Sequence, residues 1–515
     1  MTTDGEAGPP DPEAWLTVPV DAGDATPDTP TGQHPGRGRR WLAVVVGVAV
    51  IAIVGATFAV LRPDASTAGH PDEWDARVQP LVDFVEGERN LFFEHPVQVD
   101  FLSIDEWEER AATEATDAEA EMSDEDRRLL ESGASLFRAL GLAEGELDLL
   151  ESFEQISASG TVGRYQFDDQ RISVRGSELD IESKKTLVHE LTHALQDQRF
   201  DIGDRYDEDA EETDEDQLDA LVEGDAERIE AAWTDQLSEA RRAELDAAMQ
   251  STGDEAAGAL AGVPDSVLTF VQAPYILGRR FIDALLASGG NEAVNEAFVD
   301  PPGPEEHVLD PLSYLDDDQP IDVDSPPLTG SEVAIENLDG EFGALGLFVM
   351  LAERIDPLDA LVAVDGWAGD AFVAFERDHT TCVRATIAAE DDLSADALVA
   401  ALENWRDAMP AAAAAAVERT GTRTTFETCD PGPDADVLDG DGRSSDAIAI
   451  PSVRIDLAIE VLREDGTVAQ ARCFSRGFLG LLTVEEIFAD VLPPDRQAAL
   501  QEGAVALGQE CSRRR

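Results

Sequence analysis

The sequence predicts a mixed α+β domain that follows a single transmembrane helix. Three observations support this fold class. Several segments repeat apolar residues at helical spacing, residues 160–175 alternate like a β-hairpin, and residues 41–61 form an uncharged apolar run of 21 residues. We expect the soluble domain to occupy residues 71–410 and a C-terminal extension to occupy 411–515.

The N-terminal region predicts a membrane anchor. Residues 1–40 are rich in Pro, Gly, Thr and Asp, which is typical of a disordered tail. The run at 41–61 is long enough to span a bilayer. Arg37, Arg39 and Arg40 precede it and only Arg62 follows directly, so the positive-inside rule places the tail in the cytoplasm and the later domain outside the cell. A cleaved signal peptide is the alternative, but its leader and apolar core are normally shorter.

The composition limits the partners. The formal net charge is −72, and Lys184 and Lys185 are the only lysines. Such a surface repels phosphate, which argues against nucleic acid or anionic lipid as a ligand. Apolar residues make up 43% of the chain, enough to build a core. A salt-exposed source would explain the acidic excess.

The most informative stretch is His-Glu-Leu-Thr-His at residues 189–193. Positions i and i+4 lie on one face of a helix, so His189 and His193 can direct their ring nitrogens at one metal ion. Glu190 lies beside them and can act on a water molecule without being a ligand. The alternative is an amphipathic helix with incidental histidines, but seven histidines in 515 residues make this spacing rare by chance.

A second predicted helix at 218–233 supplies the third ligand. A catalytic zinc ion takes three protein ligands and keeps one position open. Glu223 lies thirty residues after His193 and is our first candidate. Asp219, Asp225 and Glu227 on the same acidic helix remain alternatives.

These two helices resemble the gluzincin branch of the zincin metallopeptidases, whose members have a thermolysin-like arrangement. The resemblance implies that His189, His193 and Glu223 bind one catalytic Zn²⁺ and that Glu190 is the general base. It implies that Glu227 supports a zinc-bound histidine from outside the ligand set. It also implies a zincin-like fold, in which a mixed sheet accompanies the metal helix and the second half is mostly helical.

The same resemblance gives the hairpin at 160–175 a role as the sheet edge along which an extended substrate lies. Gln196 and Arg199 stand where a metzincin needs Gly and His, which excludes that branch. Charged residues flank the motif, so an intramembrane protease is also excluded.

A peptidase needs a donor for the oxyanion that forms on the scissile carbonyl. His307, in the Pro-rich loop at 301–315, is our first candidate, and Tyr275, near the start of a helix that ends at Gly289 and Gly290, is our second. A structural role for His307 remains the alternative. The acidic runs at 201–216 and 429–446 are expected to be solvated loops, with Ca²⁺ binding as a further alternative.

The C-terminal extension is expected to be α/β, with strands at 453–462 and 468–474 and a final helix ending near Cys511. Four cysteines in an oxidising compartment suggest two disulfides. Of the three connectivities, we expect sequential pairing of Cys382 with Cys429 and of Cys473 with Cys511. Each bond would close a loop of about 40 residues, worth roughly 4 kcal/mol in the chain-entropy model.

We therefore expect a membrane-anchored, extracellular zinc metallopeptidase that acts on a peptide or protein. Nothing resembles the substrate-amine motif of the related aminopeptidases, which favours endopeptidase action. A catalytically silent, zinc-containing binding module on the cell surface is the alternative from another class. A metal-dependent hydrolase of a non-peptide substrate would use the same ligands.

Overall fold

The computed structural model of this chain describes residues 70–514, apart from 159–161, 177, 207–214, 436–443 and 490. The predicted tail at 1–40 and the predicted membrane helix at 41–61 lie outside the described residues. Within the described part, every helix is too short or too polar to cross a membrane. The expected fold class is therefore corrected to a mixed α/β fold without a demonstrated membrane span.

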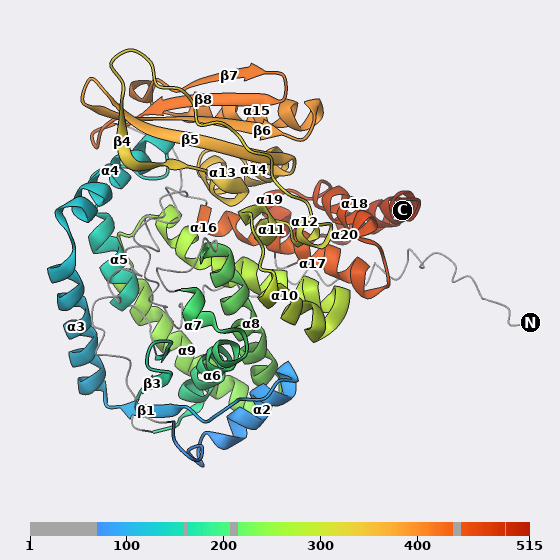
Figure 1. The fold of residues 1–515 in the computed structure, drawn as a ribbon. Helices are drawn as coiled ribbons and strands as arrows, with labels where there is room; N and C mark the ends of the chain where they lie inside the picture. The colour runs from blue at the N-terminus through green and yellow to red at the C-terminus, as the bar shows by residue number, and fades with distance from the viewer. Residues whose placement is uncertain are drawn as a thin grey trace, which may run out of the picture.

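The N-terminal part contains a small sheet and the helices around it. Its elements are α2 (Gln79–Arg89), β1 (Gln98–Leu102), α3 (Ile104–Glu121), α4 (Asp124–Leu140), α5 (Leu149–Ala158), β2 (Gly163–Gln166) and β3 (Arg171–Arg175). The strand order is β1-β3-β2, with β1 parallel and β2 antiparallel to β3. The predicted hairpin is confirmed as β2 and β3. Figure 1 shows this sheet at the bottom of the molecule, with α3 running from it toward the large sheet.

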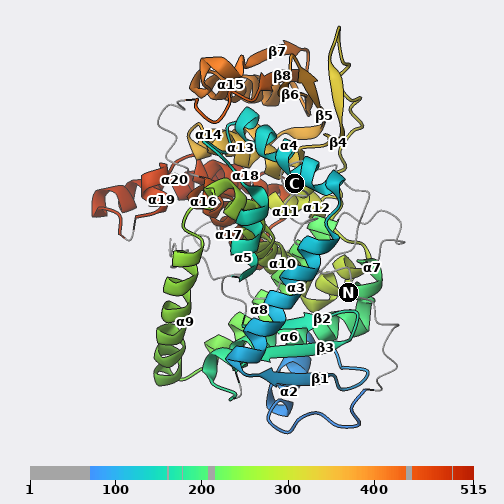
Figure 2. The same cartoon turned by 90° about the vertical axis from the view of Figure 1, so that its left-hand side faces the viewer.

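A helical layer follows. It consists of α6 (Ile181–Phe200), α7 (Ile202–Arg205), α8 (Glu215–Asp235), α9 (Glu239–Ala259), α10 (Asp265–Val299), α11 (Glu305–Leu309) and α12 (Pro311–Leu315). The predicted stop at Gly290 appears as a break inside α10, where Gly290 has φ 66° and ψ −158°. Figure 2 shows α9 projecting along one side of this layer.

Helices α8 and α10 touch through their backbones. A Cβ atom added to Gly224 would overlap the carbonyl of Gly278, and one added to Gly278 would overlap the carbonyl of Ala220. Neither contact is with a flexible side chain that could move aside. Both glycines are therefore required by the packing of these two helices.

We expect Gly278→Ala to lower the free energy of unfolding by about 1–3 kcal/mol, because the new methyl group must push two backbones apart. Gly253→Ala in α9 is the matched control, since nothing lies within 4 Å of its added Cβ. That substitution should stabilise the helix by roughly 0.5–1 kcal/mol. Urea denaturation measures the free energy of unfolding of both variants. Similar changes in the two variants would contradict the close backbone contact between α8 and α10.

A second, five-stranded antiparallel sheet lies at the top of Figure 1. Its strands are β4 (Val333–Gly340), β5 (Trp367–Arg377), β6 (Thr380–Ala389), β7 (Ala416–Thr420) and β8 (Arg423–Cys429), in the order β4-β5-β6-β8-β7. Helices α13 (Gly343–Ala352), α14 (Pro357–Val364) and α15 (Asp392–Ala408) accompany it, and the short η2 (Ala411–Ala413) precedes β7. The core between sheet and helices is aromatic, with Trp405 and Phe342 both packed on Phe426.

The last part of the chain is helical, with α16 (Ser444–Ala447), α17 (Ala449–Arg463), α18 (Val468–Leu479), α19 (Val484–Ile487) and α20 (Pro494–Cys511). The predicted strands at 453–462 and 468–474 are therefore wrong. Helix α17 buries Ile455, Ile459 and Leu462 on successive turns. Helix α18 starts with a capping box between Thr467 and Gln470.

Both predicted disulfides are confirmed. Cys382 and Cys429 join directly opposed positions of β6 and β8. Cys473 and Cys511 join α18 to the end of α20. Strands β7 and β8, inside the expected C-terminal extension, pair into the same sheet as β5 and β6.

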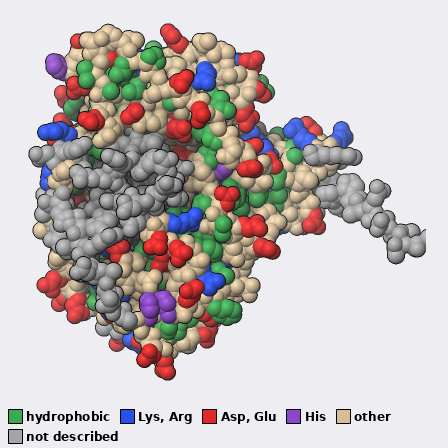
Figure 3. Space-filling model, in the orientation of Figure 1, with side chains coloured by type: hydrophobic (Ala, Val, Ile, Leu, Met, Phe, Trp, Pro, Cys, Tyr) green, Lys and Arg blue, Asp and Glu red, His purple; other side chains and the backbone are tan. Residues whose placement is uncertain are grey.

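Acidic side chains are spread over the face shown in Figure 3, with basic side chains among them.

Candidate metal centre

Helix α6 carries the His-Glu-x-x-His motif into the interior. Its first turn is capped by Asp180, whose side chain accepts a hydrogen bond from the N–H of Ser183 at 2.8 Å. All side chains from Thr186 to Gln198 are buried. This part of α6 is therefore enclosed, and packing fixes its orientation.

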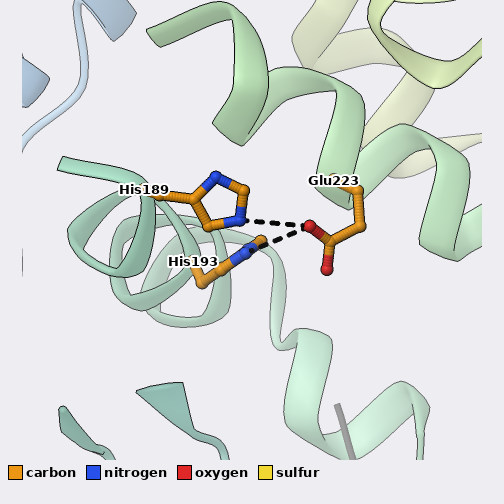
Figure 4. Close-up of side chains that lie close together, drawn as sticks. All are labelled: His189, His193 and Glu223. Carbon is orange, nitrogen blue, oxygen red and sulfur yellow. Dashed lines mark hydrogen bonds and ion pairs between the residues drawn. The ribbon is translucent and has the colours of Figure 1, made fainter. Parts of the chain in front are cut away.

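Three potential ligands converge from α6 and α8 (Figure 4). The Nε2 atoms of His189 and His193 lie 3.1 and 3.6 Å from Oε2 of Glu223. The ligand atoms of this group all lie within 4.8 Å of one another. Tetrahedral zinc with bonds of about 2.0–2.1 Å holds its ligand atoms roughly 3.3 Å apart. The three side chains therefore fit a zinc ion with little rearrangement.

The other ring nitrogens of both histidines face further groups. Nδ1 of His193 lies 3.0 Å from Oε1 of Gln196. Nδ1 of His189 faces Oε2 of Glu230 at 3.6 Å. Metal-binding histidines usually donate this second nitrogen to a carboxylate or carbonyl, which leaves Nε2 free for the metal. The arrangement therefore turns both Nε2 atoms toward Glu223.

The carboxylates around His189 favour a proton on its ring. Burial opposes protonation of this ring, but the carboxylates of Glu223 and Glu230 outweigh it and raise the pKa of His189 to about 10. A metal ion would take the place of this proton.

Glu190 has one oxygen in use and one available. Its Oε2 accepts a hydrogen bond from the N–H of Tyr165 on β2 at 2.6 Å. Its Oε1 is buried and has no hydrogen-bond partner among the described residues. Burial raises the pKa of Glu190, in the direction that suits a general base.

The alternative third ligands are engaged elsewhere. Asp219 accepts a hydrogen bond from the hydroxyl of Tyr206 at 2.6 Å. Asp225 forms a buried ion pair with Arg89 at 2.8 Å and accepts an amide N–H from Gln196 at 3.0 Å. These contacts favour Glu223 as the ligand.

The structure places Glu230 beside Nδ1 of His189, and the supporting role expected of Glu227 stays a prediction. Glu230 lies seven residues after Glu223, which is two helical turns, so both point from the same face of α8. This i, i+7 spacing is visible in the sequence, but the resemblance predicts a supporting acid at the i+4 position. Glu227 is partly exposed, and its charge contributes to the raised pKa of Tyr275 described next.

Tyr275 on α10 lies within electrostatic reach of the centre. Burial, followed by the charges of Glu223 and Asp219, raises its pKa well above the usual value. Its phenol therefore stays protonated at neutral pH and can donate a hydrogen bond. Of the two expected oxyanion donors, Tyr275 is the one whose pKa is raised by the charges of the acids of the centre.

His307, the first expected donor, has another environment. Its Nε2 donates a hydrogen bond to the backbone carbonyl of Asp318 at 2.8 Å, and its ring packs against Tyr314. Burial lowers the pKa of His307, which keeps the ring neutral. The described ligand cluster does not include it. Its only ring N–H is already used, so the structure favours the structural alternative for this residue.

Glu306, next to His307, gives a pH prediction. Burial, together with Asp310 and Glu390, raises the pKa of Glu306 to about 8, against about 4.3 in an unfolded chain. Between these values the folded protein keeps a proton that the unfolded chain has lost, so stability falls as pH rises through this window. Glu306→Gln should remove that loss. Its free energy of unfolding at pH 8 should exceed that of the wild type by on the order of 1–2 kcal/mol, allowing for solvent screening.

Urea denaturation at pH 5 and pH 8 tests this expectation. Glu502→Gln is the control, because it removes an exposed carboxylate from α20. If Glu306→Gln changes stability equally at both pH values, a raised pKa of Glu306 is contradicted.

Neither a family model, nor a curated protein, nor a solved structure matches this chain. Three ligand atoms, a nearby carboxylate with a free oxygen and a protonated phenol fit an open, catalytic zinc site better than a closed structural one, which uses four protein ligands.

Proposed function

We propose that this protein is a zinc-dependent metallopeptidase whose centre is formed by His189, His193 and Glu223, with Glu190 as the general base. The observation that carries the proposal is the position of Glu190. Its Oε1 is buried beside the converging ligands and has no partner among the described residues. A purely structural zinc site has no use for such a carboxylate.

Each side chain has a defined task. A zinc ion, when bound, acts as a Lewis acid and makes water acidic enough to ionise near neutral pH. Glu190 takes the proton of the attacking water at Oε1 and passes it to the departing amine. The N–H of Tyr165 holds the other oxygen of Glu190, so that Oε1 keeps its direction. The hydroxyl of Tyr275 donates to the oxygen of the scissile carbonyl.

The position of β2 supports a peptide as the substrate. This strand lies at one edge of the three-stranded sheet, and the backbone N–H of Tyr165 in it donates a hydrogen bond to Glu190. An extended peptide that added a strand at this edge would place its backbone next to the general base. The two disulfides further support a location in an oxidising compartment.

The test uses the full-length wild-type chain. We expect about one zinc ion per chain by elemental mass spectrometry and cleavage of an unfolded protein such as casein. Treatment with 1,10-phenanthroline should abolish cleavage, and added Zn²⁺ should restore it. A wild-type chain that binds no zinc would refute the proposal. Zinc binding without cleavage of casein or of a peptide library would instead support the silent binding module.

A further inference from the structure

We propose that Lys185 is a positioning residue that fixes the orientation of His189 by acting through Glu230. The proposal rests on the zinc site described above and adds an element that the motif does not contain. Lys185 lies four residues before His189 on α6, so the two side chains leave the same face of the helix.

The contacts form a continuous chain from α6 to α8 and back. Nζ of Lys185 lies 2.6 Å from Oε1 of Glu230. Oε2 of the same carboxylate faces Nδ1 of His189 at 3.6 Å. The side chains of Lys185 and Glu230 are only 11% and 3% exposed, so water does little to weaken the pair.

The consequence concerns the direction of Glu230. A carboxylate on a free side chain could turn either oxygen toward His189 or neither. Since the ammonium group of Lys185 holds Oε1, Oε2 is left facing the ring. This contact favours the tautomer with the proton on Nδ1, which leaves the Nε2 lone pair for the metal.

The two histidines are therefore supported differently. His193 has a neutral amide, Gln196, at its Nδ1. His189 has a carboxylate that is itself held by a lysine. Outside the adjacent Lys184, every basic residue of the chain other than histidine is an arginine. Lysine is a compact point charge, whereas the planar arginine fork needs more space, which suits lysine to this enclosed position.

The adjacent lysines supply a matched pair of variants. We would measure zinc affinity of the full chain by competition with a chromophoric chelator for Lys185→Met, Lys184→Met, Glu230→Gln and the double variant Lys185→Met/Glu230→Gln. The visible spectrum of the Co²⁺-loaded protein reports ligand geometry independently of catalysis. Thermal unfolding without metal checks that each variant folds, and the double variant leaves no buried charge unpaired.

We expect Glu230→Gln to weaken zinc binding by roughly 10–100-fold and Lys185→Met by about tenfold, in the range for residues that support metal ligands. Both should alter the Co²⁺ spectrum, and Lys184→Met should behave like wild type. If Lys185 acts through Glu230, the double variant should bind zinc no more weakly than Glu230→Gln alone.

Two results would overturn the positioning role. One is wild-type zinc affinity in Lys185→Met. The other is a loss from Lys185→Met that is as large in the Glu230→Gln background as in wild type. A wild-type chain without zinc would instead refute the proposed function, so the two failures are distinguishable.

Discussion

Glu190→Gln is expected to lower kcat for peptide hydrolysis by about a thousandfold, within the range for loss of a general base, while zinc stays bound. The substitution keeps the shape of the side chain. The amide oxygen can still accept the N–H of Tyr165, now 2.6 Å from Oε2. The position of Oε1 would then be taken by an NH₂ group, which cannot accept the proton of water.

The control is Glu182→Gln in the first turn of the same helix. Glu182 accepts a hydrogen bond from Thr252 and lies outside the centre. Zinc content and initial rates on one peptide should be measured for both variants. A Glu190→Gln protein that cleaves at the wild-type rate would show that this carboxylate only anchors β2 to α6.

Glu223→Ala is expected to reduce bound zinc from about one ion per chain to almost none after dialysis against a weak chelator. Two histidines alone do not make a catalytic zinc site, which takes three protein ligands. A ligand that binds only the folded state stabilises it, so added zinc should raise the unfolding temperature of the wild type. It should not raise that of Glu223→Ala.

Asp219→Asn separates this effect from a general loss of charge on α8. Asp219 lies one turn before Glu223 and bonds to Tyr206 instead. It should therefore keep its zinc. If Glu223→Ala kept its zinc and Asp219→Asn lost it, the third ligand would be Asp219 and not Glu223.

The parts of the fold that short-range sequence signals specify were predictable. The spacing of His189 and His193 predicts one helix, and the alternation at 160–175 predicts a hairpin. The even number of cysteines predicted two disulfides, and the sequential pairing that the structure shows was one of three connectivities open in the sequence. In each of these cases the geometry depends on residues close in the chain or on pairing that the chain order favours.

Other features depend on contacts between distant elements. The β-branched residues Val453, Ile455 and Ile459 predict a strand, but packing of α17 against α10 outweighs this local preference. The scarcity of histidines makes His307 a candidate donor in the sequence, but its ring nitrogen bonds to the carbonyl of Asp318, which is distant from the centre's helices in the chain. The position of Glu230 beside His189 depends on how α8 is rotated against α6, which no local pattern in α8 determines.

The backbone contact between α8 and α10 has a consequence for sequence divergence. Glu223 directly precedes Gly224, and Tyr275 lies one turn before Gly278. Because no side chain separates the helices at this crossing, their spacing does not depend on the size of the surrounding core residues. Homologous chains could replace much of that core and still keep the same distance between acid and phenol. A search for such homologues should therefore require glycine at both crossing positions, together with the histidine motif.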